Sequence, residues 1–185
     1  MTLFVFAFYR QGLDAVGPGL LEDRSVTAIG DHDRQLRRKV VLGKRGGLEL
    51  SDNRLGRPLG EELLEPTRLY VSTVLDLMGV AEVKAAAHVT GGGLIGRGTK
   101  LVPQGCRLVL DPDSYAVPPI FDLIGEAGNV TKDELARTFN MGLGFMVVLS
   151  PHEYASKRSD LASGWLEVGK VIQGPSGVEL GYARS

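Results

Sequence analysis

The sequence predicts an α+β fold in which helices cover a mixed β-sheet. Short runs of β-branched and aromatic residues predict strands, and longer segments with apolar residues at helical spacing predict helices. These strands and helices do not alternate strictly, which favours a mixed sheet over a doubly wound parallel one. Hydrophobic residues make up 43% of the 185 residues, enough for a substantial core.

Composition and charge exclude several kinds of protein. The net charge of −1 predicts neither nucleic-acid binding nor attraction to an anionic membrane. Cys106 is the one cysteine, so no internal disulfide can form, and no metal-ligand spacing surrounds it; a small buried side chain is the simpler interpretation. The apolar start lacks a basic region and a cleavage site, and Arg10 ends it well short of a membrane span. We therefore expect a cytoplasmic protein.

The apolar residues 3–9 predict a strand buried on both faces. We expect its natural neighbours to be absent, which would leave an unpaired apolar edge that invites self-association. Deleting residues 1–9 would then improve solubility. Further along, residues 33–42 suggest a short basic helix.

The clearest helical region follows Pro66, which suits a first helical turn. Apolar residues recur at helical spacing over residues 70–78, and Gly79 is placed to end the helix. The elements expected after it are a strand over 83–88, a strand over 106–110, a helix from Pro118 or Pro119 to Gly128, a short helix opened by a capping box of Thr131 and Glu134, a buried strand over 145–149, and a closing hairpin of WLEVGKVI and VELGY joined by residues 174–177.

Residues 88–93, His-Val-Thr-Gly-Gly-Gly, form a glycine turn directly behind the strand expected over 83–88. Such a turn presents backbone N–H groups with no Cβ in the way, as phosphate sites require. Thr90 adds a hydroxyl, and His88 can donate or titrate near neutral pH. From the residues alone, close packing against a neighbouring element explains the glycines equally well, and His88 is more simply a structural histidine.

A second turn, Asn140-Met-Gly-Leu-Gly144, precedes the strand expected over 145–149. Glycines two apart lie on one side of an extended chain, so another backbone or a ligand can pack closely there. Close packing is the simpler interpretation of this turn alone. Because both turns feed strands, a site shared between them becomes more plausible.

The segments RPLGEELLEPTRLYV, AHVTGGGL, VPPIFDLIGEAGNVTKDELARTFNMGLGF and GWLEVGKVI together resemble the C-terminal half of phosphoribosylformylglycinamidine cyclo-ligases, the AIR synthetase family. The resemblance covers about residues 36–180. It implies a three-layer α/β/α domain over residues 31–185, preceded by a divergent segment over 1–30. It also implies a homodimeric enzyme whose N-terminal half, which the resemblance does not cover, carries most of the ATP and magnesium site.

The family's reaction makes the imidazole ring of purines from formylglycinamidine ribonucleotide. ATP activates the formyl oxygen as a phosphate ester, and the amidine nitrogen closes the ring and expels phosphate. The resemblance implies that His88 is catalytic. The substrate- or phosphate-binding residues that it implies are Thr90, Gly91, Gly92, Gly93, Asn140, Gly142 and Gly144, with no metal ligand among them.

The chain also departs from the family pattern. After the glycines the family shows Glu-Asn and then Arg, where this chain has Gly96-Arg97 and Lys100. The family's Gly-Leu-His-Ser-Asn-Gly motif is expected at GDHDRQ. There His32 is the remnant of the motif, and its Ser-Asn-Gly is absent. We expect the chain to be inactive without an N-terminal half, as a truncated or split cyclo-ligase. A non-catalytic phosphate-binding module stays open as the alternative; TFNMGLG argues against the selenophosphate-forming and hydrogenase-maturation enzymes.

Overall fold

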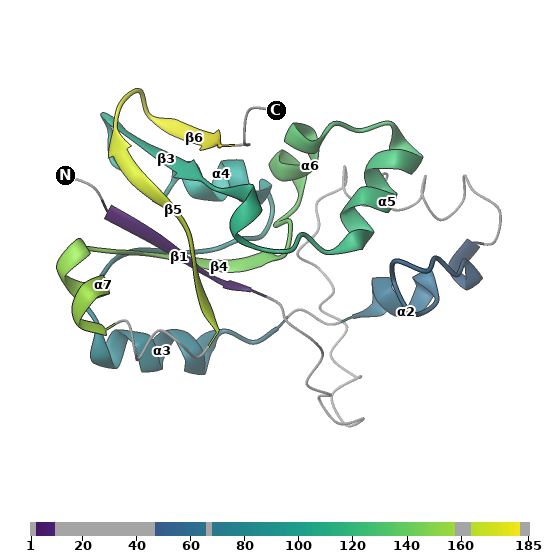
Figure 1. The fold of residues 1–185 in the computed structure, drawn as a ribbon, viewed down its shortest axis with the longest axis horizontal. Helices are drawn as coiled ribbons and strands as arrows, with labels where there is room; N and C mark the ends of the chain where they lie inside the picture. Colours follow the sequence, from purple (N-terminus) through teal and green to yellow (C-terminus); the bar gives the residue numbers. More distant parts are fainter. Residues whose placement is uncertain (1–2, 10–46, 66–67, 158–163, 182–185) are drawn as a thin grey trace.

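The computed structural model describes residues 3–9, 47–65, 68–157 and 164–181 (Figure 1). The expected helix over 33–42 and the expected role of Pro66 lie outside these ranges. The strands are β1 (Leu3–Tyr9), β2 (Val83–His88), β3 (Cys106–Leu110), β4 (Leu143–Leu149), β5 (Trp165–Gln173) and β6 (Gly177–Leu180). The helices are α2 (Leu59–Leu64), α3 (Val71–Val80), α4 (Gly93–Thr99), α5 (Pro119–Gly128), α6 (Lys132–Thr138) and α7 (Pro151–Lys157), with 3-10 turns η2 (Gly47–Glu49) and η3 (Pro112–Ser114).

The strands form one mixed six-stranded sheet in the order β2-β4-β1-β5-β3-β6. Every neighbouring pair is antiparallel except β3 and β6, which are parallel. The mixed sheet predicted from the sequence is confirmed. The closing hairpin is wrong, because β3 lies between β5 and β6. The N–H of Gly174 donates to the carbonyl of Gly105 at 3.0 Å, which carries the β5–β6 connection past the start of β3.

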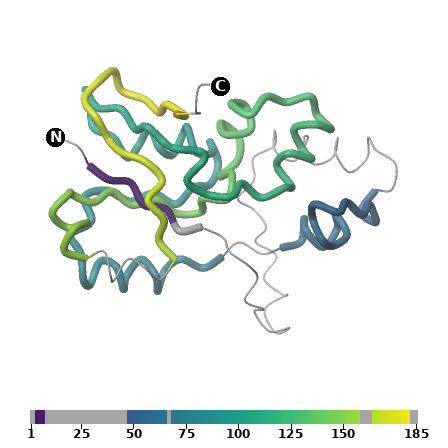
Figure 2. Tube along the Cα trace, viewed as in Figure 1, coloured from purple at the N-terminus to yellow at the C-terminus, as the bar shows by residue number. Residues whose placement is uncertain are grey.

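Strand β1 is an inner strand, not an unpaired edge. Val5 lies opposite Val148 of β4 on one side and Gly169 of β5 on the other. Figure 2 shows the purple β1 running among the green and yellow segments of the later chain. The expectation that residues 3–9 lack neighbours is therefore wrong, and with it the reason for expecting better solubility after their deletion.

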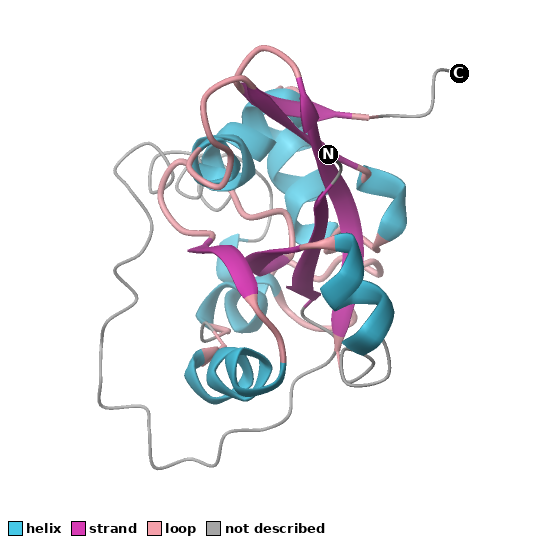
Figure 3. Ribbon diagram, turned by 90° about the vertical axis from the view of Figure 1, so that its left-hand side faces the viewer, coloured by secondary structure: helices cyan, strands magenta, loops and turns pink. Residues whose placement is uncertain are grey.

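Helices cover both faces of the sheet, as Figure 3 shows. On one face, Val5 and Ala7 of β1 belong to a core cluster with Leu94 of α4, Ile124 of α5 and Leu135 of α6. The opposite face is covered by α3 and α7, whose side chains pack with the alternate residues of β1, Phe4 and Phe6. The period-2 alternation of strand side chains separates these two clusters. The result is the three-layer α/β/α arrangement that the family resemblance implies.

Helix α3 confirms the predicted helix but buries little of its apolar surface. Tyr70, just before the helix, and Leu77 are buried, whereas Val71, Leu75 and Met78 are more than half exposed. Gly79 lies within the helix, which ends one residue later than expected. One apolar stripe therefore faces the sheet, and a second one faces solvent.

Helix α5 begins and ends where the sequence predicts, and α6 begins where it predicts. Pro119 is the first residue of α5, and Asn129 ends it in the left-handed conformation with φ 50°. The side chain of Thr131 accepts a hydrogen bond from the N–H of Glu134, which caps α6. Helix α4 is not predicted, since glycine at three of its seven positions lowers its intrinsic helix propensity.

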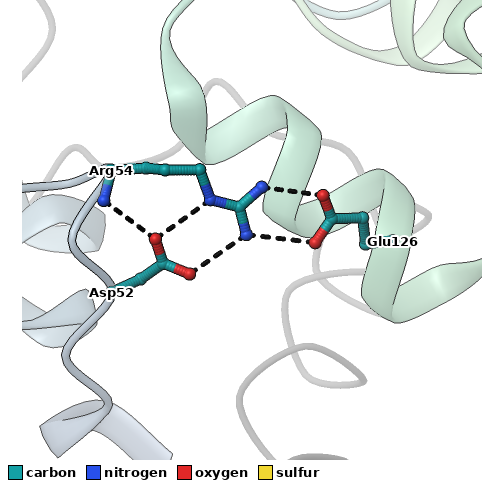
Figure 4. Close-up of polar contacts among 3 residues, drawn as sticks. All are labelled: Asp52, Arg54 and Glu126. Carbon is teal, nitrogen blue, oxygen red and sulfur yellow. Dashed lines mark hydrogen bonds and ion pairs between the residues drawn. The ribbon is translucent and has the colours of Figure 1, made fainter.

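An ion-pair network connects the segment that precedes α2 with helix α5 (Figure 4). The Arg54 guanidinium donates to both carboxylate oxygens of Glu126, at 2.7 and 3.0 Å, and to both oxygens of Asp52, at 3.0 Å each. Hydrogen bonds from Arg54 hold the pKa of Asp52 below its ordinary value. Because Arg54 and Glu126 are exposed and Asp52 is only half-buried, the network orients the segment more than it adds stability.

Candidate ligand-binding site

The two glycine-containing turns lie side by side in the structure. Strand β2 ends at His88, and its antiparallel neighbour β4 begins at Leu143, so both turns emerge at the same end of the sheet. The N–H of Val89 donates to the carbonyl of Gly144 at 2.9 Å, and the N–H of Leu94 donates to the carbonyl of Phe139 at 3.1 Å. The structure therefore brings together the residues of the two predicted motifs.

The first turn needs two of its three glycines for structural reasons. The N–H of Gly93 donates to the carbonyl of Thr90 at 3.0 Å, which closes a β-turn. Gly92 has φ 92° and ψ 0°, the conformation that a type II turn requires at its third residue. Gly93 has φ 59°, and a Cβ there would overlap the Ala136 carbonyl oxygen and lie 2.7 Å from the Arg137 carbonyl carbon. The bare backbone of Gly93 therefore lets α4 approach α6.

Gly91 has no comparable structural reason to be glycine. A Cβ built on it meets no atom within 4 Å, and its φ is not positive. Gly91 and Gly92 are exposed, and their N–H groups donate no hydrogen bond to any residue of the described ranges. The half-buried Thr90 places its hydroxyl beside them in the chain. These are the donors that an anionic ligand can reach.

The second turn is fixed by its own hydrogen bonds. Asn140 accepts through its carbonyl from the N–H of Leu143 at 2.9 Å, and through its side-chain oxygen from the N–H of Gly142 at 3.0 Å. Met141 has φ 51° and Gly142 has φ 96°, the two positive values of a type I′ turn. In this structure Asn140 and Gly142 shape the chain, which supports the close-packing interpretation.

Gly144 leaves room for an aromatic ring. A Cβ built on Gly144 would overlap the hydroxyl oxygen and Cζ of Tyr70. Tyr70 is 8% exposed, and its ring centroid lies 5.5 Å from that of His88 and 5.8 Å from that of Phe145. Gly144 therefore contacts a protein side chain, not an open surface where a ligand could bind.

His88 lies at the end of β2, exposed to solvent but partly covered by its neighbours. Partial burial lowers the pKa of its imidazole, and the nearby positive charge of Arg97 lowers that pKa further. His88 is therefore mainly neutral at neutral pH, able to donate one hydrogen bond and accept another. Since the folded protein holds this proton less tightly than the unfolded chain does, the fold loses stability as the pH falls below about 6.5.

Arg97 is a site residue that the sequence did not predict. It extends from α4, where its Nε–H donates to the carbonyl of Gly91 at 3.1 Å. Its positive charge acts on His88, and it forms no ion pair with any carboxylate of the described ranges. Sequence reasoning missed it because α4 was not predicted; a helix over 93–99 would have turned Arg97 back toward the turn.

The described part of the chain offers no metal centre. No group of three histidine, cysteine, aspartate or glutamate side chains lies close enough together there to hold a metal ion. None of its helices is long and apolar enough to cross a membrane. The site instead combines one cation, one neutral imidazole and several N–H and O–H donors, a set that suits an anion.

Residues 34–180 match the family model described as AIR synthase related protein, C-terminal domain. The chain belongs to this family. The family resemblance seen in the two glycine motifs is thereby confirmed. Strand β1 lies before the matched range, although the structure places it inside the sheet.

Curated relatives of the chain are phosphoribosylformylglycinamidine cyclo-ligases. The chain is 40% identical over 147 residues to the one from Anaeromyxobacter sp. (strain Fw109-5), with 80% of this chain and 43% of the relative covered. It is 44% identical over 144 residues to the one from Myxococcus xanthus, with 75% of this chain and 41% of the relative covered. The chain thus spans about two fifths of the length of these relatives.

Solved structures share the fold at low sequence identity. The thiamine monophosphate kinase of Aquifex aeolicus matches with a TM-score of 0.55 at 14% identity, covering 99% of this chain and 51% of that one. The thiamine-monophosphate kinase of Stenotrophomonas maltophilia matches with a TM-score of 0.53 at 15% identity, covering 97% and 50%. These likenesses concern the fold alone.

Proposed function

We propose that the chain is the C-terminal half of an ATP-dependent phosphoribosylformylglycinamidine cyclo-ligase and acts in purine biosynthesis together with an N-terminal half. The family match and relatives at 40% and 44% identity support the reaction class. The observation that carries the proposal is the glycine turn, where the N–H groups of Gly91 and Gly92, unpaired within the described ranges, lie next to Thr90, His88 and Arg97. The substrates would be formylglycinamidine ribonucleotide and ATP, in a cytoplasmic enzyme that dimerises as its family does.

In this proposal the turn binds the anionic phosphate of the ribonucleotide or the phosphoryl group in transfer. The Gly91 and Gly92 N–H groups and the Thr90 hydroxyl donate to phosphate oxygens, and Arg97 supplies positive charge. The neutral imidazole of His88 contacts the reacting end of the substrate and donates one hydrogen bond there. Positioning and charge stabilisation supply most of the catalysis in phosphoryl chemistry. The second turn supports the first one: its residues Asn140, Gly142 and Gly144 shape the backbone that lies beside the glycine turn.

Magnesium does not fit the residues of this site. A divalent cation prefers carboxylate and carbonyl oxygens, whereas the groups here are hydrogen-bond donors and a cation. We therefore assign the magnesium ion, and the ATP that it accompanies, to the N-terminal half. No step of the proposed role of this chain passes through the metal.

A non-catalytic phosphate-binding module is the second candidate. The departures at Gly96, Arg97 and Lys100 from the family pattern favour it. Both candidates predict phosphate binding at the turn, and they differ in whether an N-terminal half restores ring closure. One binding experiment and one activity experiment therefore test them separately.

We expect phosphate and ribose 5-phosphate to bind the turn weakly, with a Kd near 1 mM or about −4 kcal/mol, because only half of the site is present. Amide chemical shifts should change at Thr90, Gly91 and Gly92 during an NMR titration. Gly91→Ala should weaken binding without loss of stability, because its Cβ enters open space where the ligand approaches. Gly79→Ala is the matched control, since its Cβ also meets no atom within 4 Å, far along α3. No shift changes at residues 88–94 in large ligand excess would contradict the proposal.

We expect the purified chain alone to show no substrate-dependent ADP release, because the ATP site is assigned to the other half. Addition of the N-terminal half of the Myxococcus xanthus relative should produce turnover, and the same mixture with His88→Ala should not. Turnover by the chain alone, above that of the His88→Ala variant, would refute the assignment of the ATP site to the N-terminal half. Binding of phosphate without any restored turnover would favour the non-catalytic module.

A further inference from the structure

Three aromatic rings form a contiguous cluster beside the glycine turn. The centroid of Tyr70 lies 5.5 Å from that of His88, edge to face at 61°, and 5.8 Å from that of Phe145. His88 and Phe145 stack at 6.0 Å with an interplanar angle of 23°. Two rings from different elements thus restrict the imidazole, one from the start of α3 and one from β4.

The backbone of β4 is adapted to this cluster. Gly144 precedes Phe145, and the space that its Cβ would fill holds the phenol of Tyr70. The carbonyl of Gly144 accepts from the N–H of Val89, the residue that follows His88. Because Gly144 has no side chain, Tyr70 can pack against it. Its backbone carbonyl binds the residue that follows β2, the strand that ends at His88.

We propose that Tyr70 is a positioning residue that holds the His88 imidazole in one orientation at the glycine turn, and that residue 144 is glycine so that the phenol fits beneath. The function of this contact between Tyr70 and His88 rests on the proposed role of His88 toward substrate. Tyr70 does not contact the reacting atoms; it limits the rotation of His88 and shields one side of the ring from water. Aromatic pairs of this geometry add attraction beyond the area they bury.

Two properties of His88 follow from the contact with Tyr70. A held imidazole keeps its donor and acceptor nitrogens pointing in fixed directions, which lowers the entropy lost when a ligand binds. A shielded imidazole is harder to protonate than a solvated one. The second property can be measured without any substrate.

The test follows the His88 ring resonances of the full chain by NMR during a pH titration. His88→Gln identifies the His88 signals among those of the three histidines. We expect Tyr70→Leu to raise the pKa of His88 toward its ordinary value, through loss of the shielding ring, and to remove the ring-current contribution of Tyr70. Tyr70→Phe should keep the His88 titration closer to that of the parent than Tyr70→Leu does, because it keeps the ring. Gly144→Ala should resemble Tyr70→Leu, because it expels the phenol with Tyr70 still present.

Leu77→Ala is the control for mere destabilisation. It removes from α3, the helix that Tyr70 precedes, a side chain that is only 3% exposed and lies about two turns beyond Tyr70, and it should leave the His88 titration unchanged. A folded Tyr70→Leu variant with the parent titration curve would overturn the proposal. Absence of nuclear Overhauser contacts between the Tyr70 and His88 rings in the parent would overturn it without any variant. If the parent binds no phosphate but Tyr70→Leu raises the pKa of His88 as expected, the proposed function is refuted and the positioning role of Tyr70 stands.

Discussion

Val5→Asp is expected to lower the free energy of unfolding by about 4 kcal/mol or more, enough to unfold a domain of ordinary stability. Val5 has no exposed surface and lies in an inner strand, paired to β4 and β5. An aspartate there would bury a charge with no partner, or force β1 out of the sheet. Circular-dichroism melts and the soluble yield measure the loss.

Deletion of residues 1–9 should have the same effect, because it removes the strand that joins β4 to β5. The control is Ala86→Asp on the edge strand β2, where residue 86 is exposed; its cost should stay within about 1 kcal/mol. A deletion variant that folds and melts as the parent does would show that β1 is dispensable to the sheet.

Gly93→Ala should cost about 3 kcal/mol of stability and separate α4 from α6. The positive φ accounts for about 1 kcal/mol, and the forced movement of two backbones apart for the rest. The added methyl group meets the carbonyl groups of Ala136 and Arg137, which are helix backbone and cannot rotate away. Thermal or urea unfolding of the variant gives the change.

The neighbouring glycines provide a graded comparison. Gly92→Ala should cost about 1 kcal/mol from its φ alone, since its Cβ comes no closer than 3.7 Å to another residue. Gly91→Ala should change stability by less than about 0.5 kcal/mol. Equal costs at residues 91, 92 and 93 would contradict the separation of structural and ligand-binding glycines.

Local signals in the sequence predicted most of the elements. Strand β3, the start of α5 and the cap of α6 are encoded by runs of a few residues, by Pro119 and by Thr131, and all were found where expected. The neighbours of each strand are not encoded locally. Nothing in residues 174–177 indicates that β3 separates β5 from β6, and nothing in residues 3–9 indicates strands that pair from more than 130 residues away.

Helix α3 shows a second limit of sequence patterns. Apolar residues at helical spacing mark both the stripe that contains Leu77 and the stripe of Val71, Leu75 and Met78. Periodicity predicts the helix but does not say which stripe faces the sheet, because that choice depends on the β4 and β5 side chains it meets. The three exposed residues add little to the described core.

The candidate site was predicted in part. The two motifs were expected to meet, and they do, through the hydrogen bonds of Val89 and Leu94. Their glycines were expected to act alike, but the structure gives them different surroundings: Gly93 meets a helix and Gly144 a tyrosine, while Gly91 stays open. A sequence shows that a side chain is absent and does not show what occupies its place. Tyr70 was missed for the same reason, since its importance lies in what it contacts, whereas Arg97 was missed because α4 was not predicted.

The inner position of β1 also bears on how the chain folds. Residues 3–9 leave the ribosome long before the strands on either side of them, Leu143–Leu149 and Trp165–Gln173, which follow by more than 130 residues. Strand β1 therefore cannot pair with both neighbours until residues 143–173 have left the ribosome, and this pairing closes loops of well over 100 residues. A low rate of folding and a need to protect an apolar strand in the meantime follow from that order. We therefore expect the order of the strands, separately from the stability of the finished fold, to decide how well the chain folds during expression.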